Sequence, residues 1–89
     1  MSTTKKFESF INEPMGEKHV IEVPGVGKKT AEKLGSDGIE KAYQLQGQYL
    51  LQGKNESEFN DMLQDKYRMN TKNAGQCTDS ISQYTNRNT

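Results

Sequence analysis

The chain has 89 residues, of which 30% are apolar, a mean hydropathy of −1.01, and 12 basic and 12 acidic side chains that leave no net charge. This length suits one domain, which we place over residues 1–89, and it excludes barrels and enzymes that pair a nucleotide-binding sheet with a substrate domain. A core this small leaves little stability in reserve, so self-association would supply further burial.

Several site classes are not indicated. No apolar run approaches the ~18 residues of a membrane span, and residues 1–10 lack an apolar stretch of secretory-signal length, so we expect no direct membrane binding. The single cysteine, Cys77, has no partner for an internal disulfide, which favours a reducing compartment. Cys77 and the one histidine, His19, are distant in sequence, so we expect no metal, no cofactor, no catalytic pair, and a buried Cys77.

The first predicted element is a short helix over the first ten residues, which ends at 12–14 because the residue before proline leaves the helical region. Its candidate N-caps are Ser2, Thr3 and Thr4, and its apolar face carries Phe7, Phe10 and Ile11. A loop follows at 15–18. The apolar run at 20–23 fits either a strand or one helical turn.

The next two helices are interrupted or ended by glycines. One begins near Gly27, has an inner face of Val26, Ala31 and Leu34, and ends where Gly35 or Gly38 adopts a left-handed conformation. Another follows Ile39, with a pattern of Ala42, Tyr43, Leu45, Tyr49 and Leu50. Gly47 in its middle costs about 1 kcal/mol relative to alanine, which is typical of close approach by another backbone.

Two further helices complete an all-α, compact bundle of about five helices. Residues 53–55 break the chain, and Asn55 caps a helix with an apolar face of Phe59, Met62, Leu63 and Tyr67. Asn70 or Thr71 caps the last helix, whose inner side carries Ala74, Cys77, Ile81 and Tyr84. We expect residues 86–89, which are polar, to be frayed.

The most informative segment is VPGVGKKTAEKL at 23–34, which has the pattern of a helix-hairpin-helix motif over about 20–35. Gly25 and Gly27 permit a tight turn and let a phosphate reach the backbone. Val26 anchors the turn in the core, and Ala31 lets the two helices pack closely.

The start of the motif's second helix is a candidate anion site. Free amides around Gly27 and Lys28 lie at the positive end of the helix dipole, and Lys28, Lys29 and Lys33 add charge. Further candidates are Lys5–Lys6 and Asn70–Thr71–Lys72. Such a site contacts phosphates, so we expect binding to double-stranded DNA without sequence preference. The alternatives are a turn that binds nothing and, at 70–72, an ordinary helix cap.

The chain resembles the barrier-to-autointegration factor family. The likeness rests on EPMGEK at 13–18, GVG at 25–27, KAY at 41–43 and GQYL at 47–50, together with Phe10, Leu34, Gly38, Phe59 and Asn70. It implies a SAM-like, non-enzymatic chromatin protein whose symmetric homodimer bridges two DNA duplexes and acts in nuclear assembly. It also implies the partners and places of that family: LEM-domain proteins of the inner nuclear membrane, lamins and histones, in the nucleus, its envelope and chromatin, and also in the cytoplasm.

The resemblance also implies roles for individual residues. The implied DNA contacts are Lys6, Gly25, Gly27, Lys33, Asn70, Thr71 and Lys72. The implied dimer interface includes Gln44, Gly47, Tyr49 and Leu50. The implied phosphorylation sites, which would oppose the DNA backbone, are Ser2, Thr3 and Thr4.

The chain departs from the family where subunits pair. Met62 and Tyr84 replace usual tryptophans, and Gln44, Gln46 and a polar C-terminus dilute the apolar face. The alternative function is therefore a divergent, non-bridging paralogue, an adaptor or modulator that heterodimerises with a standard family member or binds LEM-domain proteins. A fragment of a DNA glycosylase or nuclease is disfavoured, because such enzymes need a second domain.

Overall fold

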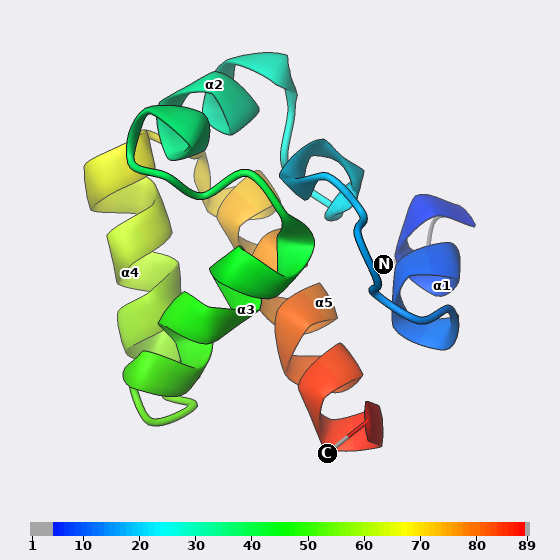
Figure 1. The fold of residues 1–89 in the computed structure, drawn as a ribbon. Coiled ribbons are helices and arrows are strands. Elements are labelled where there is room, and N and C mark those ends of the chain that lie inside the picture. Colours follow the sequence, from blue (N-terminus) through cyan, green and yellow to red (C-terminus); the bar gives the residue numbers. More distant parts are fainter. Residues whose placement is uncertain (1–4, 89) are drawn as a thin grey trace.

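The computed structural model describes residues 5–88, and it confirms the predicted all-α bundle (Figure 1). Five α-helices and one 3₁₀ turn follow in the order α1 (Lys5–Asn12), η1 (Val20–Glu22), α2 (Lys28–Ser36), α3 (Ala42–Leu51), α4 (Glu56–Tyr67) and α5 (Thr71–Asn88). No strand is present between residues 5 and 88.

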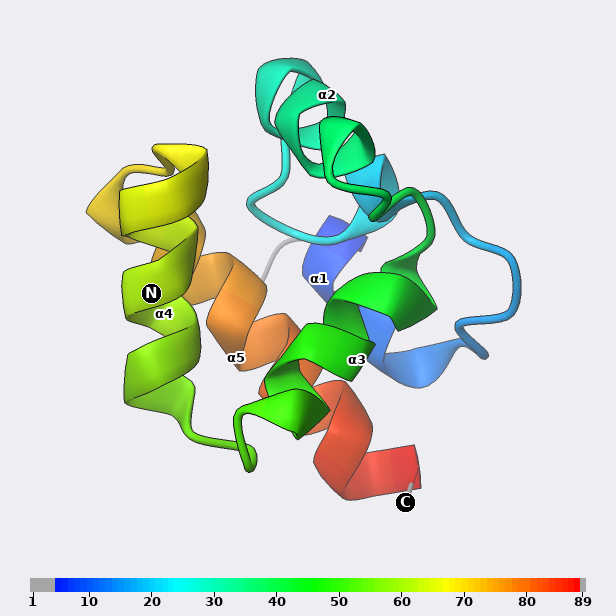
Figure 2. The same ribbon diagram turned by 60° about the vertical axis from the view of Figure 1, so that its left-hand side comes forward.

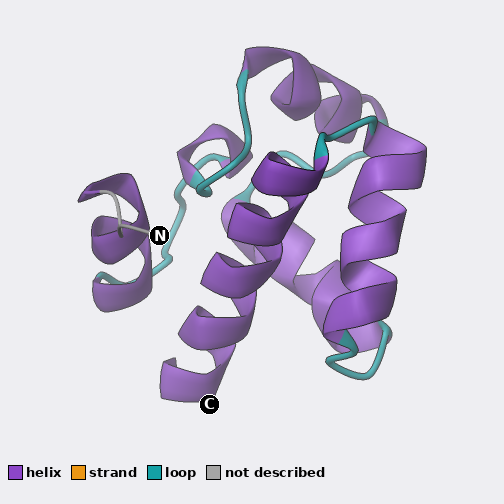
Figure 3. Ribbon diagram, turned by 180° about the vertical axis from the view of Figure 1, so that it is seen from behind, coloured by secondary structure: helices purple, strands orange, loops and turns teal. Residues whose placement is uncertain are grey.

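The longest helix, α5, is the centre of the arrangement. Seen from behind, it runs between α1 on one side and α4 on the other, and it contacts both (Figure 3). The helix α3 packs against η1, α4 and α5, while α2 lies across one end of the bundle against η1 and α4 (Figure 2). The hairpin formed by η1 and α2 is thereby held at the end of the molecule where α5 begins.

The apolar faces predicted for α1 and α2 form part of a single core, to which every helix contributes. In α3, however, two residues of the predicted pattern lie outside it: Tyr43 is 46% exposed and Leu50 is 43% exposed. Helix geometry explains the difference, because Ala42, Leu45 and Tyr49 already occupy the inner face. Tyr43 and Leu50 each come one residue after an inner residue, so their side chains are rotated by about 100° around the helix axis, away from the core.

Several predicted boundaries are confirmed in detail. The Asn55 side chain accepts a hydrogen bond from the amide of Glu58 at 3.0 Å, and of the two candidates at α5, Asn70 is the cap, because its Oδ1 accepts from the amide of Asn73 at 2.8 Å. Gly38 adopts a positive φ of +83°, whereas Gly35 remains within α2. The caps proposed for the first helix, Ser2 to Thr4, lie outside the described residues.

The apolar run at 20–23 forms a helical turn rather than a strand. His19 caps this turn, since its Nδ1 accepts from the amide of Ile21 at 3.1 Å. The backbone on either side of His19 pairs with the start of α3. The amide of Val20 donates to the carbonyl of Glu40, and the amide of Ala42 donates to the carbonyl of Lys18, both at 2.8 Å. The hairpin is therefore tied to α3 by main-chain bonds.

The expectation of a frayed C-terminal segment is wrong for residues 86–88. The helix α5 continues to Asn88, and Arg87 Nη1 donates to Asn12 Oδ1 at 2.7 Å. Nearby, the Tyr84 hydroxyl accepts from the amide of Met15 at 2.8 Å. These bonds fasten the last turns of α5 to α1 and to the loop that follows α1.

Three further features of residues 5–88 are the surroundings of Cys77, the apolar character of the helices and the grouping of possible metal ligands. Cys77 is fully buried, as predicted, and this burial raises the pKa of its thiol to about 12. Among the helices of residues 5–88, none has the length and apolar character needed to cross a membrane. In the same part of the chain, no three His, Cys, Asp or Glu side chains converge on a metal position.

Candidate nucleic-acid interface

The loop between η1 and α2 is anchored by two buried valines. Val23 and Val26 are 0% and 1% exposed, and the amide of Val26 donates to the carbonyl of Val23 at 3.0 Å. Between them Gly25 has a φ of +86°, a conformation that glycine adopts without the steric cost other residues meet. The valines thus fix the loop in the core, while Gly27 at the end of the loop is exposed.

The structure gives Gly25 a packing role that the sequence does not predict. A Cβ at this position would overlap the carbonyl oxygen of Asn73 and would lie 3.2 Å from the amide nitrogen of Cys77. The missing side chain therefore makes room for the backbone of α5. This contact locks the hairpin loop onto the first turns of α5.

Gly27 has the surroundings that were expected of both glycines. It is exposed, it precedes α2 as its N-cap, and a Cβ there would meet nothing within 4 Å. Because glycine has no side chain to cap the helix, the first amides of α2, at residues 28–30, have no side-chain acceptor. These donors and the helix dipole form an open position for an anion.

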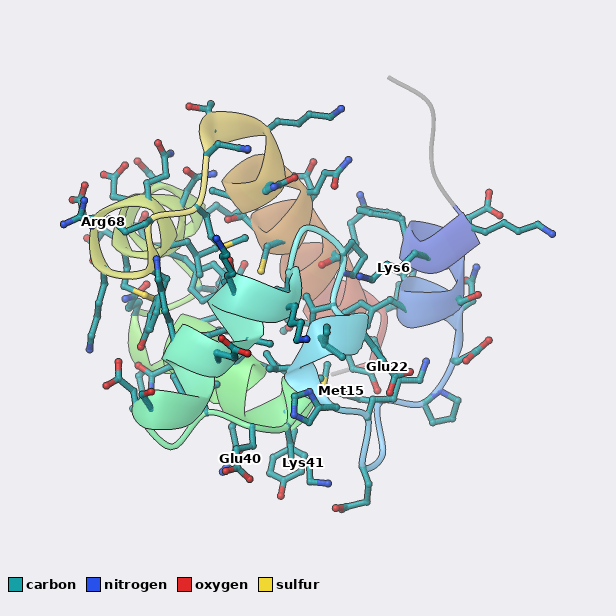
Figure 4. The ribbon with its side chains drawn as sticks, turned by 90° about the horizontal axis from the view of Figure 1, so that it is seen from above. Lys6, Met15, Glu22, Glu40, Lys41 and Arg68 are labelled. Carbon is teal, nitrogen blue, oxygen red and sulfur yellow. The ribbon has the colours of Figure 1, made fainter. Side chains whose placement is uncertain are left out.

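The helix α1 reaches the same loop through Lys6. Its Nζ donates to the carbonyl of Val26 at 3.4 Å, and Figure 4 shows this side chain extending from α1 toward the hairpin. The bond places a positive charge beside the loop and occupies a carbonyl that would otherwise repel a phosphate. Two of the sequence candidates, Lys6 and the hairpin, are thus brought together.

The start of α5 completes this end of the molecule. Asn70, Thr71 and Lys72 are exposed there, and Asn70 uses its side-chain oxygen to cap the helix. Two residues that the sequence did not point to, Asn73 and Gln76, line a hollow together with Lys6 and residues 24–27. They carry no charge and are distant from the hairpin in sequence, so no local pattern identifies them.

The candidate lysines at this end are not neutralised by carboxylates. Between residues 5 and 88, three ion pairs form, and their cations are Lys18, Lys41 and Lys66. The exposed lysines outside these pairs include Lys5, Lys6, Lys28, Lys29, Lys33 and Lys72. On α2, Lys29 and Lys33 share one face, four residues apart. These cations are available for an external anion.

The far end of α2 is held by a buried hydroxyl. Tyr67 on α4 donates from its hydroxyl to Asp37 Oδ2 at 2.8 Å, and Lys66 lies 3.8 Å from the same oxygen. Burial, then the hydrogen bond and the charge of Asp37, raise the pKa of Tyr67 to about 12. This contact fixes the C-terminal end of α2 against α4.

The residues proposed for subunit pairing have different surroundings. Gln44 Oε1 accepts from the amides of Glu40 and Lys41, and Tyr49 is 2% exposed with its ring 5.4 Å from that of Phe59. A Cβ on Gly47 would meet nothing within 4 Å, so no backbone of its own subunit approaches it. Leu50 and, at 81% exposure, Leu51 place apolar surface at the end of α3.

Comparison with known proteins gives consistent matches along the chain. The model of the barrier to autointegration factor family matches residues 1–88. The barrier-to-autointegration factor of Danio rerio is 37% identical over 83 residues, covering 93% of this chain and 92% of the relative. The barrier-to-autointegration factor of Homo sapiens is 39% identical over 77 residues, which cover 86% of each chain. That of Drosophila melanogaster is 33% identical over 82 residues, which cover 92% of this chain and 91% of the relative.

Proposed function

Because this chain belongs to the barrier-to-autointegration factor family, we propose that it is a non-enzymatic chromatin protein that binds double-stranded DNA without sequence preference. As a symmetric homodimer it bridges two duplexes, and it acts in chromatin organisation and nuclear assembly. The observation that carries the proposal is the uncapped start of α2 at Gly27, surrounded by lysines that form no ion pair within residues 5–88.

The proposed contacts are to the DNA backbone. Free amides at a helix start hold a phosphate oxygen, and lysine side chains neutralise the neighbouring phosphates. Such contacts position a duplex but do not distinguish base pairs. The centre of the proposed site is formed by Lys6, the backbone of Gly25, Val26 and Gly27, and Asn70, Thr71 and Lys72. It is extended by Lys5, Lys28, Lys29 and Lys33.

Bridging requires two such sites on one particle. In a two-fold dimer each subunit presents one hairpin, so two duplexes are held together. The exposed face of α3, with Gly47, Leu50 and Leu51, supports this arrangement, because it is apolar and open in the single subunit. We assign the subunit interface to this face.

The wider role follows from family membership and belongs to the same proposal. It includes LEM-domain proteins of the inner nuclear membrane, lamins and histones as partners, with the nucleus, its envelope and chromatin as the main location and the cytoplasm as a second. It also includes regulation by phosphorylation at Ser2, Thr3 and Thr4. A phosphate on one of these residues, which precede Lys6 closely in sequence, would compete with DNA for the Lys6 side chain.

Titration of labelled duplexes tests the DNA-binding function. We expect duplexes of unrelated sequence to bind within about tenfold of one another, and affinity to fall steeply as salt concentration rises. Capture of a second, differently labelled duplex measures bridging. A preference of more than about tenfold for one sequence over its shuffled version would contradict a backbone-only mode.

A second candidate, a non-bridging adaptor, is favoured by one feature of α3. The side chain of Gln46, which lies beside Gly47, donates to the hydroxyl of Thr85 at 3.0 Å within the same subunit. A polar contact of this kind dilutes an apolar interface. Light scattering separates the two functions, because an isolated monomer at high micromolar concentration would support the adaptor and exclude bridging by a homodimer.

A further inference from the structure

The hollow between α1, the hairpin loop and α5 contains two neutral hydrogen-bonding side chains. Asn73 and Gln76, which are half-buried, line it opposite Lys6 and residues 24–27. Within residues 5–88, neither side-chain amide forms a hydrogen bond, although the main chain of Asn73 does. Each NH₂ group is therefore a free donor beside the proposed phosphate position at Gly27.

We propose that Gln76, with Asn73 beside it, donates hydrogen bonds to the DNA backbone next to the phosphate held at Gly27. The hairpin and the first turns of α5 then form one continuous phosphate track rather than two separate sites. This inference rests on the DNA-binding function proposed above and adds two contact residues to it.

The geometry of α5 supports a continuous track. Lys72 and Gln76 are four residues apart and Asn73 and Gln76 are three apart, so these side chains share one face of the helix. The close contact of Gly25 with the backbone of Asn73 holds this face at a fixed position beside the loop. The helix backbone that carries these donors is thus in place before DNA arrives, so binding has to order only their side chains.

The zero net charge of the protein increases the contribution that neutral hydrogen-bond donors make to DNA affinity. With equal numbers of acids and bases, the chain gains little from long-range attraction, so directional hydrogen bonds carry a larger share of affinity. Amide donors release no counterions when they bind a phosphate. Their contribution is therefore the same at low and high salt, unlike that of a lysine.

Titration of one short duplex at several salt concentrations tests this inference. We expect Gln76→Ala to weaken binding about five- to tenfold at every salt concentration, without a change in the salt slope. Lys72→Ala should weaken binding and reduce the slope by about 1. Gln76→Lys should bind more tightly with a slope steeper by about 1, a gain that misfolding does not produce.

The matched control is Gln83→Ala, an exposed position further along α5 that does not line the hollow. It should bind within about twofold of the parent protein. If Gln76→Ala and Gln76→Lys both bind like the parent while Gly27→Glu does not, the track is refuted and the hairpin site stands. If the parent protein binds no duplex, the proposed function itself fails.

Discussion

Two glycines, Gly25 in the hairpin loop and Gly47 in α3, have opposite surroundings. The backbone of α5 fills the space beside Gly25, whereas the space beside Gly47 is open. One chain therefore completes the packing at the hairpin, but it leaves the α3 face without a neighbour. The comparison shows that contacts within the subunit explain the loop glycine Gly25, whereas they do not explain Gly47, which lies inside a helix at a cost to helix stability.

The largest effects are expected at Gly25 and Gly27, where substitution should reduce stability at the first position and DNA binding at the second. Gly25→Ala adds a side chain at a positive φ and against the α5 backbone, so we expect a loss of about 2–5 kcal/mol in the free energy of unfolding. Gly27→Glu should leave the thermal midpoint nearly unchanged, but it should weaken duplex binding by at least about 100-fold, because a carboxylate would face the phosphate. Thermal melts and duplex titrations measure both changes.

Each of these two predictions has a result that would contradict it. If Gly27→Glu bound duplex DNA as well as the parent protein, the hairpin would not be the site. If Gly25→Ala were as stable as the parent, the close contact between the loop and α5 would be absent in solution.

The next effect concerns the open face of α3. Gly47→Glu adds a charge where we place the subunit interface, while the single subunit has room for the new side chain. We expect monomers that bind one duplex, with unchanged or slightly higher helical stability, and no capture of a second duplex. Light scattering and the bridging assay measure these results.

Gly35→Glu is the matched control, since Gly35 also lies in a helix with open space beside it. It should leave the oligomeric state of the parent protein unchanged. A Gly47→Glu protein that associates like the parent would move the interface away from this part of α3.

The smallest effect concerns the contact that fixes the end of α2. Tyr67→Phe removes the hydrogen bond to Asp37, which we expect to cost about 1–2 kcal/mol in urea unfolding at neutral pH. The folded-state pKa of Tyr67 is raised from 10.0 to about 12, so the parent protein loses stability as pH rises from about 10 toward 12. The phenylalanine variant should lack this part of the loss.

Cys77 adds a second alkaline loss that Tyr67→Phe leaves in place. Its pKa rises from 9.0 to about 12 on burial, so the stability gained by keeping the thiol neutral falls from about pH 9 upward. The free energy of unfolding should therefore fall less between pH 8 and pH 11 for Tyr67→Phe than for the parent protein. Equal differences for the two proteins would show that Tyr67 is not held in its neutral form by the fold.

Local patterns in the sequence were sufficient for much of this fold. The caps at Asn55 and Asn70, the buried Val26, Ala31 and Leu34, and the exposed Gly27 all follow from signals within a few residues. The resemblance to the barrier-to-autointegration factor family is confirmed by the match over residues 1–88. These features depend on helix periodicity and capping, which act over one or two turns.

Other features depend on contacts between distant segments, which no local pattern contains. The packing role of Gly25 could not be predicted, because the approach of Asn73 is visible only in the folded chain. The same holds for the bond from Lys6 to Val26 and for the hydroxyl of Tyr67 on Asp37, which join residues 20 and 30 positions apart. The place of Gln76 in the hollow beside the hairpin is not predictable either, because a neutral amide in a helix resembles any other solvent-facing residue.

The contacts between α1 and the last turns of α5 have a consequence for biosynthesis. Arg87 bonds Asn12 across 75 positions of the chain, and Tyr84 bonds the Met15 backbone across 69. During translation, α1 leaves the ribosome long before α5, the helix against which it mainly packs, so this packing forms only after α5 has emerged. The part of the proposed DNA-binding surface that combines α1 with the start of α5 is therefore completed late in synthesis.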